Sequence, residues 1–198
     1  ITSIFFGGGT PSVLPDCCIA DILMAVRDCF DISDDAEITM ECNPGTVNES
    51  RLSEYRAAGV NRLSFGLQSA DNNELKMLGR IHTFEQFAES FRLARNAGFN
   101  NINVDLMSAI PGQTEATLEN TFDKVMALQP EHISVYSLIL ADRTCNLNLA
   151  LTPWHPYIAS THFAPEYLIV LTHIVLHFIN SRKALELIIL TPPCHKIL

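Results

Sequence analysis

With 198 residues, 47% of them apolar and 18% charged, the chain can build one globular domain with a substantial core and is not a disordered segment. Its formal net charge of −9 argues against nucleic acid as a partner, because the phosphate groups would be repelled. Residues 1–140 hold 19 acidic and 9 basic side chains, whereas residues 141–198 hold 3 and 4, so the composition places a domain boundary near residue 140.

Residues 1–140 alternate between segments typical of strands and segments typical of helices. Short apolar runs predict strands at Ser3–Phe6, Glu37–Cys42, Arg62–Gly66, Asn101–Met107 and His132–Leu138. Helical spacing of apolar residues predicts two buried helix faces, formed by Ile19, Ile22, Leu23 and Val26 and by Leu118, Phe122, Val125 and Met126. Thr83 followed by Gln86 predicts a capping box, and Gly98 predicts the end of the same helix.

Two helix-to-strand junctions, Ala58–Leu63 and Ala97–Ile102, resemble each other and lie 39 residues apart, which indicates repeated βα units. Strict βα alternation predicts an α/β fold with a parallel sheet, either doubly wound or a TIM-type barrel. Five strands are fewer than the eight of a full barrel. Polar residues follow several strands, as at the catalytic rim of a barrel, so we expect a partial TIM-type (β/α) barrel.

Residues 141–198 depart from this pattern and are expected to form an atypical apolar tail. Its segment Tyr167–Ile179 is almost continuously apolar but too short for a membrane span. His173 and His177 have a spacing that can bind metal, yet no acidic residue lies between them, and a buried or amphipathic helix is the simpler interpretation. The tail can also be read as a frameshifted sequence, and the start within a strand, without Met, as a truncation.

The six cysteines form no C-x-x-C pair and no zinc spacing. Neighbouring Cys17 and Cys18 fall in an expected helix, where they would serve as small buried apolar side chains and not as a metal pair. With no signal peptide ahead of the first strand, we expect free thiols, a cytoplasmic protein and no metal site within this chain.

Polar groups follow successive strands and carry the chemistry. The residues are the glycine run Gly7-Gly8-Gly9 with Thr10, then Glu41, Gln68, Arg80 and Asp105. Glycines leave the backbone open to a ligand. Together the set suits a ligand with an ammonium, held by Glu41, a carboxylate, held by Arg80, and sugar hydroxyls, held by Gln68 and Asp105.

Taken singly, these residues have simpler interpretations. Glu41 could be a salt-bridge partner, Asp105 a helix cap or loop anchor, Arg80 a solvated side chain, and the glycine run a structural turn. Their shared position at the ends of successive strands favours a ligand site over these alternatives.

Five motifs in chain order resemble the radical S-adenosylmethionine proteins related to oxygen-independent coproporphyrinogen III oxidase. They are Ile4–Ser12 (IFFGGGTPS), Glu41–Thr46 (ECNPGT), Arg62–Ser69 (RLSFGLQS), Leu78–His82 (LGRIH) and Asp105–Met107 followed by Pro111–Thr114 (PGQT). The resemblance covers residues 1 to about 140. The Asn-Pro-Gly-Thr and Leu-Gly-Arg-Ile-His segments look more like the heme-chaperone branch than the oxidase.

The resemblance implies a partial TIM barrel that binds S-adenosylmethionine, with contacts from Gly8, Gly9, Thr10, Glu41, Gln68, Arg80, Asp105 and Ile139. In that family a [4Fe–4S] cluster on three cysteines spaced C-x-x-x-C-x-x-C reduces the sulfonium to give a 5′-deoxyadenosyl radical. None of the six cysteines here has that spacing, and we expect the ligands ahead of Ile1 in a parent protein, after an N-terminal barrel strand that is missing from this chain. Cys42 is expected to be a packing residue.

The resemblance therefore implies a fragment of a heme-chaperone protein that binds and delivers heme or a porphyrin, without catalytic residues of its own and inactive as given. Two alternatives stay open. One is the oxidase, which decarboxylates coproporphyrinogen in porphyrin biosynthesis; the other is a barrel that binds a nucleotide-like ligand and catalyses nothing.

Overall fold

A computed structural model describes residues 1–138 and 186–190 of the chain. Six parallel strands form one sheet in the order β1-β2-β3-β4-β5-β6. The strands are β1 (Ser3–Phe6), β2 (Glu37–Cys42), β3 (Arg62–Gln68), β4 (Ile102–Ser108), β5 (His132–Ser137) and β6 (Glu186–Leu190). The helices are the 3₁₀ helix η1 (Pro11–Val13), α1 (Cys18–Cys29), α2 (Glu49–Ala58), α3 (Asn72–Met77), α4 (Phe84–Asn96) and α5 (Glu115–Ala127).

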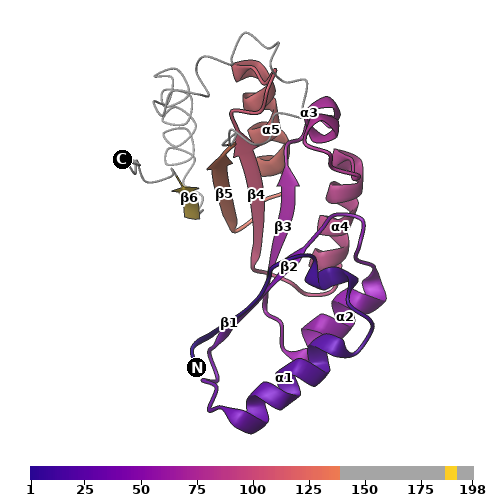
Figure 1. Cartoon of the computed structure of the whole chain (residues 1–198), viewed down its shortest axis with the longest axis vertical. Helices are drawn as coiled ribbons and strands as arrows, with labels where there is room; N and C mark the ends of the chain where they lie inside the picture. Colours follow the sequence, from indigo (N-terminus) through magenta and orange to yellow (C-terminus); the bar gives the residue numbers. More distant parts are fainter. Residues whose placement is uncertain (139–185, 191–198) are drawn as a thin grey trace, which may run out of the picture.

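Strand order follows chain order, and the helices lie along one side of the sheet (Figure 1). This arrangement confirms the predicted α/β fold, a partial TIM-type barrel. The predicted bounds of β1 and β2 are exact, while β3 to β5 differ by one or two residues at their ends. Strand β6 was not predicted; it pairs with β5 in parallel, from His132 opposite Glu186 to Tyr136 opposite Leu190.

The two faces of the sheet differ because successive side chains of a strand point to opposite sides. Alternate residues such as Met40, Phe65 and Val104 are fully buried and pack with the helices in one core. The residues between them are mostly polar and form the other face: Glu37, Thr39, Glu41, Arg62, Ser64, Asn103, Asp105, His132, Ser134 and Tyr136. The polar face is therefore available to a ligand.

The repeated junctions have the same backbone geometry. Gly59 and Gly98 follow α2 and α4 with φ of 112° and 87°, a region that glycine adopts without strain. The next residue in each, Val60 or Phe99, is fully buried, and its amide donates to a carbonyl in the last turn of the helix, that of Tyr55 or Ala94. Each helix thus ends on a glycine and re-enters the core with an apolar side chain.

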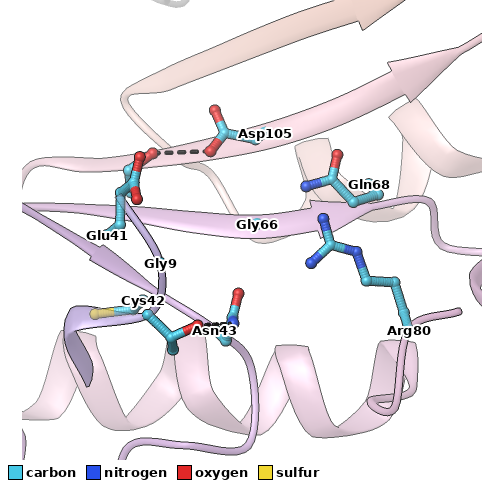
Figure 2. Close-up of a pocket in the computed structure, with 10 residues that line it drawn as sticks. Gly9, Glu41, Cys42, Asn43, Gly66, Gln68, Arg80 and Asp105 are labelled. Atoms are coloured by element: carbon cyan, nitrogen blue, oxygen red, sulfur yellow. Dashed lines mark hydrogen bonds between the residues drawn. The ribbon is translucent and has the colours of Figure 1, made fainter. Parts of the chain in front are cut away.

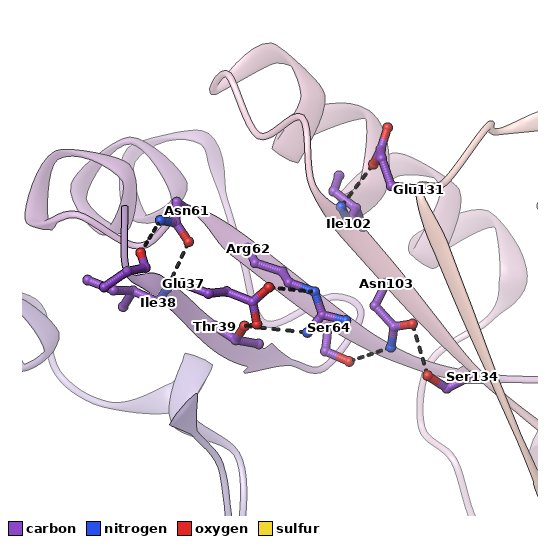
Figure 3. Close-up of polar contacts among 11 residues, drawn as sticks. Glu37, Ile38, Thr39, Asn61, Arg62, Ser64, Ile102, Asn103, Glu131 and Ser134 are labelled. Carbon is purple, nitrogen blue, oxygen red and sulfur yellow. Dashed lines mark hydrogen bonds and ion pairs between the residues drawn. The ribbon is translucent and has the colours of Figure 1, made fainter. Parts of the chain in front are cut away.

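Side chains just ahead of the strands hold the neighbouring strand in register (Figure 3). Asn61 accepts a hydrogen bond from the amide of Ile38 over 2.8 Å and donates to the carbonyl of Ala36 over 2.8 Å. Glu131 accepts from the amide of Ile102 over 2.9 Å. These contacts at the amino ends of the strands set the register that brings the polar side chains together at the carboxyl ends.

Local predictions were confirmed at α4 and partly wrong at α1. Thr83 and Gln86 form the expected capping box of α4. In α1, however, Ile22 is 43% exposed, and only Ile19 and Leu23 of the predicted face are fully buried. Helix α1 packs mainly against α2 near the end of the sheet, so a narrower stripe of it is covered.

The prediction for Cys17 was also wrong. It is exposed and precedes α1 as its N-cap, with φ of 69°, instead of packing within the helix. Cys18 is half-buried. The predicted tail at 141–198 lies, apart from β6, outside the described residues, and so do His173, His177, Cys145 and Cys194.

Candidate functional site

A pocket of about 300 Å³ opens at the carboxyl ends of β1 to β4. It is lined by Gly9, Thr10, Glu41, Cys42, Asn43, Ser64, Gly66, Gln68, Arg80 and Asp105. Figure 2 shows the carboxylates of Glu41 and Asp105 at one side of this space and the Gln68 amide with the Arg80 guanidinium at the other. Six of the eight predicted site residues therefore line one pocket.

The glycine-rich loop after β1 approaches Glu41. Gly8 and Gly9 have φ of 81° and 120°, which a side chain would strain. Gly8 is not a lining residue, but its amide donates to the Glu41 carboxylate over 3.3 Å. At Gly7, a Cβ atom would lie 3.1 Å from the carboxyl carbon of Glu41 and would clash with the ring of Phe5 at 2.3 Å. The loop can therefore lie this close to the Glu41 carboxylate only because these positions are glycines.

Hydrogen bonds tie that loop to the turn after β2. Asn43 donates from its side-chain amide to the Thr10 hydroxyl over 2.9 Å, and its backbone amide donates to the buried Ser12 hydroxyl over 3.2 Å. Ser12 and Thr46 hydroxyls lie 2.6 Å apart. The motifs Thr-Pro-Ser and Asn-Pro-Gly-Thr, distant in sequence, therefore meet across the strand ends. Sequence reasoning did not assign Asn43, Ser64 or Gly66 to the site, although all three lie within the quoted motifs.

Gln68 has a strained backbone. The register between β3 and β4 shifts between Gly66 and Gln68, and Gln68 has φ of 75°, uncommon for a residue with a side chain. The residue is only 8% exposed, but its side-chain amide faces the pocket and makes no hydrogen bond to another residue of the described segments. Strain of this kind collects at ligand sites, and an amide in this position can both donate to and accept from a ligand.

Arg80 reaches the pocket from the segment after α3. Asp71 caps α3 by accepting from the amides of Asn73 and Glu74, and Gly79, with φ of 70°, turns the chain after the helix. The amide of Arg80 then donates to the carbonyl of Leu75 over 2.9 Å. Its half-buried side chain makes no ion pair or hydrogen bond with any residue of the described segments. A guanidinium in this setting is free to bind an anionic group of a ligand.

Asp105 is held by two donors. The Ser64 hydroxyl donates to its Oδ2 over 3.0 Å, and the Asn103 amide donates to its Oδ1 over 2.8 Å. Burial raises the pKa of Asp105 above the usual value for an aspartate, and the nearby Glu41 carboxylate adds to the effect, while the two donors oppose it. Each carboxylate oxygen keeps a further acceptor position for a ligand.

Cys42 is one of the residues that line the pocket, but it is only 2% exposed and packs in the hydrophobic core. Burial, and to a smaller extent Glu41, raises the pKa of its thiol, so it stays protonated at neutral pH. This is the packing role expected for it. Within residues 1–138, no three His, Cys, Asp or Glu side chains gather where they could hold a metal ion.

Ile139 was the eighth predicted site residue, and it lies outside the described residues. No helix in the described part of the chain is long and apolar enough to cross a membrane.

Comparison with known proteins agrees with this geometry. The pattern of the radical SAM superfamily matches residues 1–125. The chain is 40% identical over 144 residues to the heme chaperone HemW of Escherichia coli, covering 73% of this chain and 38% of that protein. It is 39% identical over 150 residues to HemW of Bacillus subtilis, covering 75% and 40%.

Among solved structures, the Escherichia coli coproporphyrinogen III oxidase HemN, described as a radical SAM enzyme, superimposes with a TM-score of 0.76 at 26% identity. The match covers 91% of this chain and 41% of that one. The chain thus spans about two fifths of the length of the proteins it resembles. With the superfamily pattern over more than half of its residues, this chain belongs to the radical SAM superfamily.

Proposed function

We propose that this chain supplies the S-adenosylmethionine-binding part of a heme chaperone. One observation carries the proposal: two carboxylates, an unpartnered amide and an unpaired guanidinium line a single pocket at the carboxyl ends of parallel strands. That edge is where ligands bind in barrels of this type.

The donor and acceptor groups suit the parts of S-adenosylmethionine. Glu41 would accept from the methionyl ammonium, and Arg80 would bind the methionyl carboxylate as a charge-assisted pair. Gln68 and Asp105 would bind the ribose hydroxyls. Gly8, Gly9 and Gly66 keep side chains out of the space; a Cβ at Gly66 would lie 3.2 Å from the Gln68 amide nitrogen.

In this superfamily S-adenosylmethionine supplies radical chemistry together with a [4Fe–4S] cluster. The described residues could hold S-adenosylmethionine, but they could not hold the cluster. Cys17 and Cys29 are exposed and Cys42 is buried and protonated, and no three ligands of the described part converge. The role of this chain is accordingly to bind and orient the nucleoside and the amino acid.

Heme is the cargo that the names of the HemW relatives indicate, and their identity of 39–40% exceeds the 26% shared with HemN. This favours heme delivery over coproporphyrinogen decarboxylation, which remains the second candidate because HemN superimposes so well. The two candidates are separated by assaying a full-length protein that contains this chain together with the cluster-binding cysteines. Turnover of coproporphyrinogen by that protein would favour the oxidase, whereas hemin binding, followed by its Soret absorbance, without such turnover favours the chaperone.

The test of the pocket is calorimetry of the chain with S-adenosylmethionine and with 5′-methylthioadenosine, which lacks the amino acid. Arg80→Met should weaken S-adenosylmethionine binding about 10-fold, since a hydrogen bond to a charged group is worth about 1.5–3 kcal/mol. It should leave 5′-methylthioadenosine binding unchanged. The matched control is Arg92→Met, because Arg92 is exposed on α4 and pairs with Glu89.

Equal losses for both ligands, or an equal loss in the Arg92 variant, would contradict the assignment of Arg80 to the methionyl carboxylate. If the chain without substitutions does not bind S-adenosylmethionine, the proposed function is wrong.

A further inference from the structure

Three polar side chains beneath the pocket form a connected network across three strands. Ser64 of β3, Asn103 of β4 and Ser134 of β5 are 7%, 3% and 6% exposed. Ser64 lies directly opposite Asn103, and Ser134 lies opposite Asp105, in the parallel register. Because side chains of one parity share a face, these residues meet on the polar face of the sheet.

Figure 3 shows the part of the network that joins Ser134, Asn103 and Ser64, and the network continues from these residues to Asp105 in the pocket. The Ser134 hydroxyl donates to Oδ1 of Asn103 over 3.0 Å. The Nδ2 group of Asn103 then donates to the Ser64 hydroxyl and to Oδ1 of Asp105, both over 2.8 Å. The Ser64 hydroxyl donates in turn to Oδ2 of Asp105 over 3.0 Å.

The number of donor hydrogens limits the contacts of this network. A serine hydroxyl can donate one hydrogen, and a side-chain amide can donate two. The acceptor-only carboxylate of Asp105 selects the orientation of the Asn103 amide, because the flipped amide would place its oxygen against the carboxylate, and Ser134 supports this orientation by donating to Oδ1 of Asn103. The Nδ2 group of Asn103 donates one hydrogen to Ser64 and the other to Asp105. Both oxygens of Asp105 are therefore engaged from below and face the pocket with their remaining acceptor positions.

We propose that Ser64, Asn103 and Ser134 are positioning residues that keep Asp105 oriented and ionised for the hydroxyl groups of a ribose. The inference rests on the proposed function for its ligand, but the network itself can be tested without a ligand. A carboxylate accepts two hydroxyl donors, whereas a protonated carboxyl has lost part of this capacity.

The charges around Asp105 make such support necessary. Glu41 of β2 faces it with the same charge, and burial disfavours ionisation. Arg62 of β3 opposes these effects weakly, being hydrogen-bonded to Thr39 and paired with Glu37 at 3.8 Å. Tyr136 of β5 is neutral at pH 7, because burial and the Asp105 charge raise its pKa. Arg80 reaches the same pocket from the loop after α3.

The first experiment follows the side-chain carboxyl carbon of Asp105 by ¹³C NMR during a pH titration of the ligand-free chain, with Asp105→Asn to assign the signal. In Ser64→Ala and Ser134→Ala, each of which removes one hydroxyl, the titration midpoint of Asp105 should move to higher pH. Ser53→Ala is the control, because Ser53 lies on α2 and donates only to the Glu49 carbonyl. An unmoved midpoint in the Ser64 variant overturns the proposal.

The second experiment measures the affinity of adenosine and of 2′,3′-dideoxyadenosine, which lacks both ribose hydroxyls, between pH 5 and pH 9. Ser64→Ala should weaken adenosine binding by up to about 10-fold at the acidic end of this range, in keeping with the loss of one hydrogen bond to a charged group. The loss should become smaller as the pH rises, because a higher pH favours the ionised form of Asp105. Dideoxyadenosine should not respond.

A loss of affinity that is the same at every pH, or the same for both nucleosides, would show a merely structural role and overturn the proposal. Asn103→Asp keeps the shape of the side chain and should give the largest upward shift of the Asp105 midpoint. If neither nucleoside binds the chain without substitutions, the proposed function is wrong. The NMR titration, which uses no ligand, still decides whether the network positions Asp105.

Discussion

The side-chain amide of Asn43 donates to the hydroxyl of Thr10 over 2.9 Å, joining the turn after β2 to the glycine-rich loop after β1. Both residues line the pocket. A loop with two glycines at positive φ has high conformational entropy, so a fixed contact at its end is needed to hold it near Glu41.

Asn43→Ala should therefore weaken S-adenosylmethionine binding about fivefold and lower the free energy of unfolding by about 1 kcal/mol, the worth of one hydrogen bond. Calorimetry and urea unfolding measure the two effects. Asn100→Ala is the control, since Asn100 is exposed ahead of β4. Unchanged affinity in Asn43→Ala would show that the loop is held by other contacts.

Gln68 should show a conflict between stability and binding. Its φ of 75° strains any residue with a Cβ, by about 1–2 kcal/mol. Gln68→Gly and Gln68→Ala both remove the amide, but only the glycine relieves the strain. The glycine variant should be more stable than the alanine variant by about 1 kcal/mol in urea unfolding, and both should bind S-adenosylmethionine more weakly than the parent. A less stable glycine variant would mean that the backbone here is unstrained.

Glu74 joins three elements around the base of the Arg80 segment. Its buried carboxylate accepts from Ser69 over 2.6 Å, from Gln113 over 3.0 Å and from Thr117 over 2.7 Å, linking α3 to the loop before α5 and to α5 itself. This contact gives a structural role to Gln113 of the Pro-Gly-Gln-Thr motif, to which sequence reasoning assigned none.

Glu74→Leu should lower the free energy of unfolding by about 3 kcal/mol, because several buried donors lose their acceptor. The exposed Glu119 of α5 provides the control, and Glu119→Leu should change stability by less than about 0.5 kcal/mol. Comparable losses in the two variants would show that the carboxylate of Glu74 contributes no specific stabilisation.

His82 should make stability depend on pH. It is buried against the carbonyl of Leu67 at 3.3 Å, and burial, with a smaller effect of the Arg80 charge, lowers its pKa. The unfolded chain then binds a proton at higher pH than the folded chain does. The stabilisation is complete above the unfolded pKa of about 6.5 and is lost as the pH falls from there to the folded pKa.

Urea unfolding of the parent at roughly pH 7.5 and 5.5 should therefore show a loss of stability on acidification, and His82→Gln should show a smaller loss, since the unfolded pKa lies between the two. A loss of the same size in both proteins would assign the pH dependence to other groups.

Local patterns were enough to predict most of the fold. In strands β2 to β5, buried apolar residues alternate with mostly polar ones, and the capping box at Thr83 depends on neighbours three residues apart. The common position of Glu41, Gln68 and Asp105 followed from a general property of parallel sheets, whose carboxyl ends meet at one edge.

Features that depend on distant packing could not be predicted in this way. The exposure of Ile22 depends on how far α1 extends past the sheet, and the helical spacing of apolar residues does not predict this. The positive φ of Gln68 arises from a shift of register between β3 and β4. The contacts of Asn103 with Ser64 and Ser134 require the exact register of three strands.

The most direct test of the central claim is a map of amide chemical shifts in the ¹⁵N-labelled chain as S-adenosylmethionine is added. Binding at the carboxyl ends of the strands predicts shifts at Gly8, Gly9 and Gly66 and at the amide of Gln68. It predicts none at Gly59 and Gly98, which lie at the opposite ends of the strands. Shifts centred on Gly59 and Gly98, or no shift at millimolar ligand, would contradict the account.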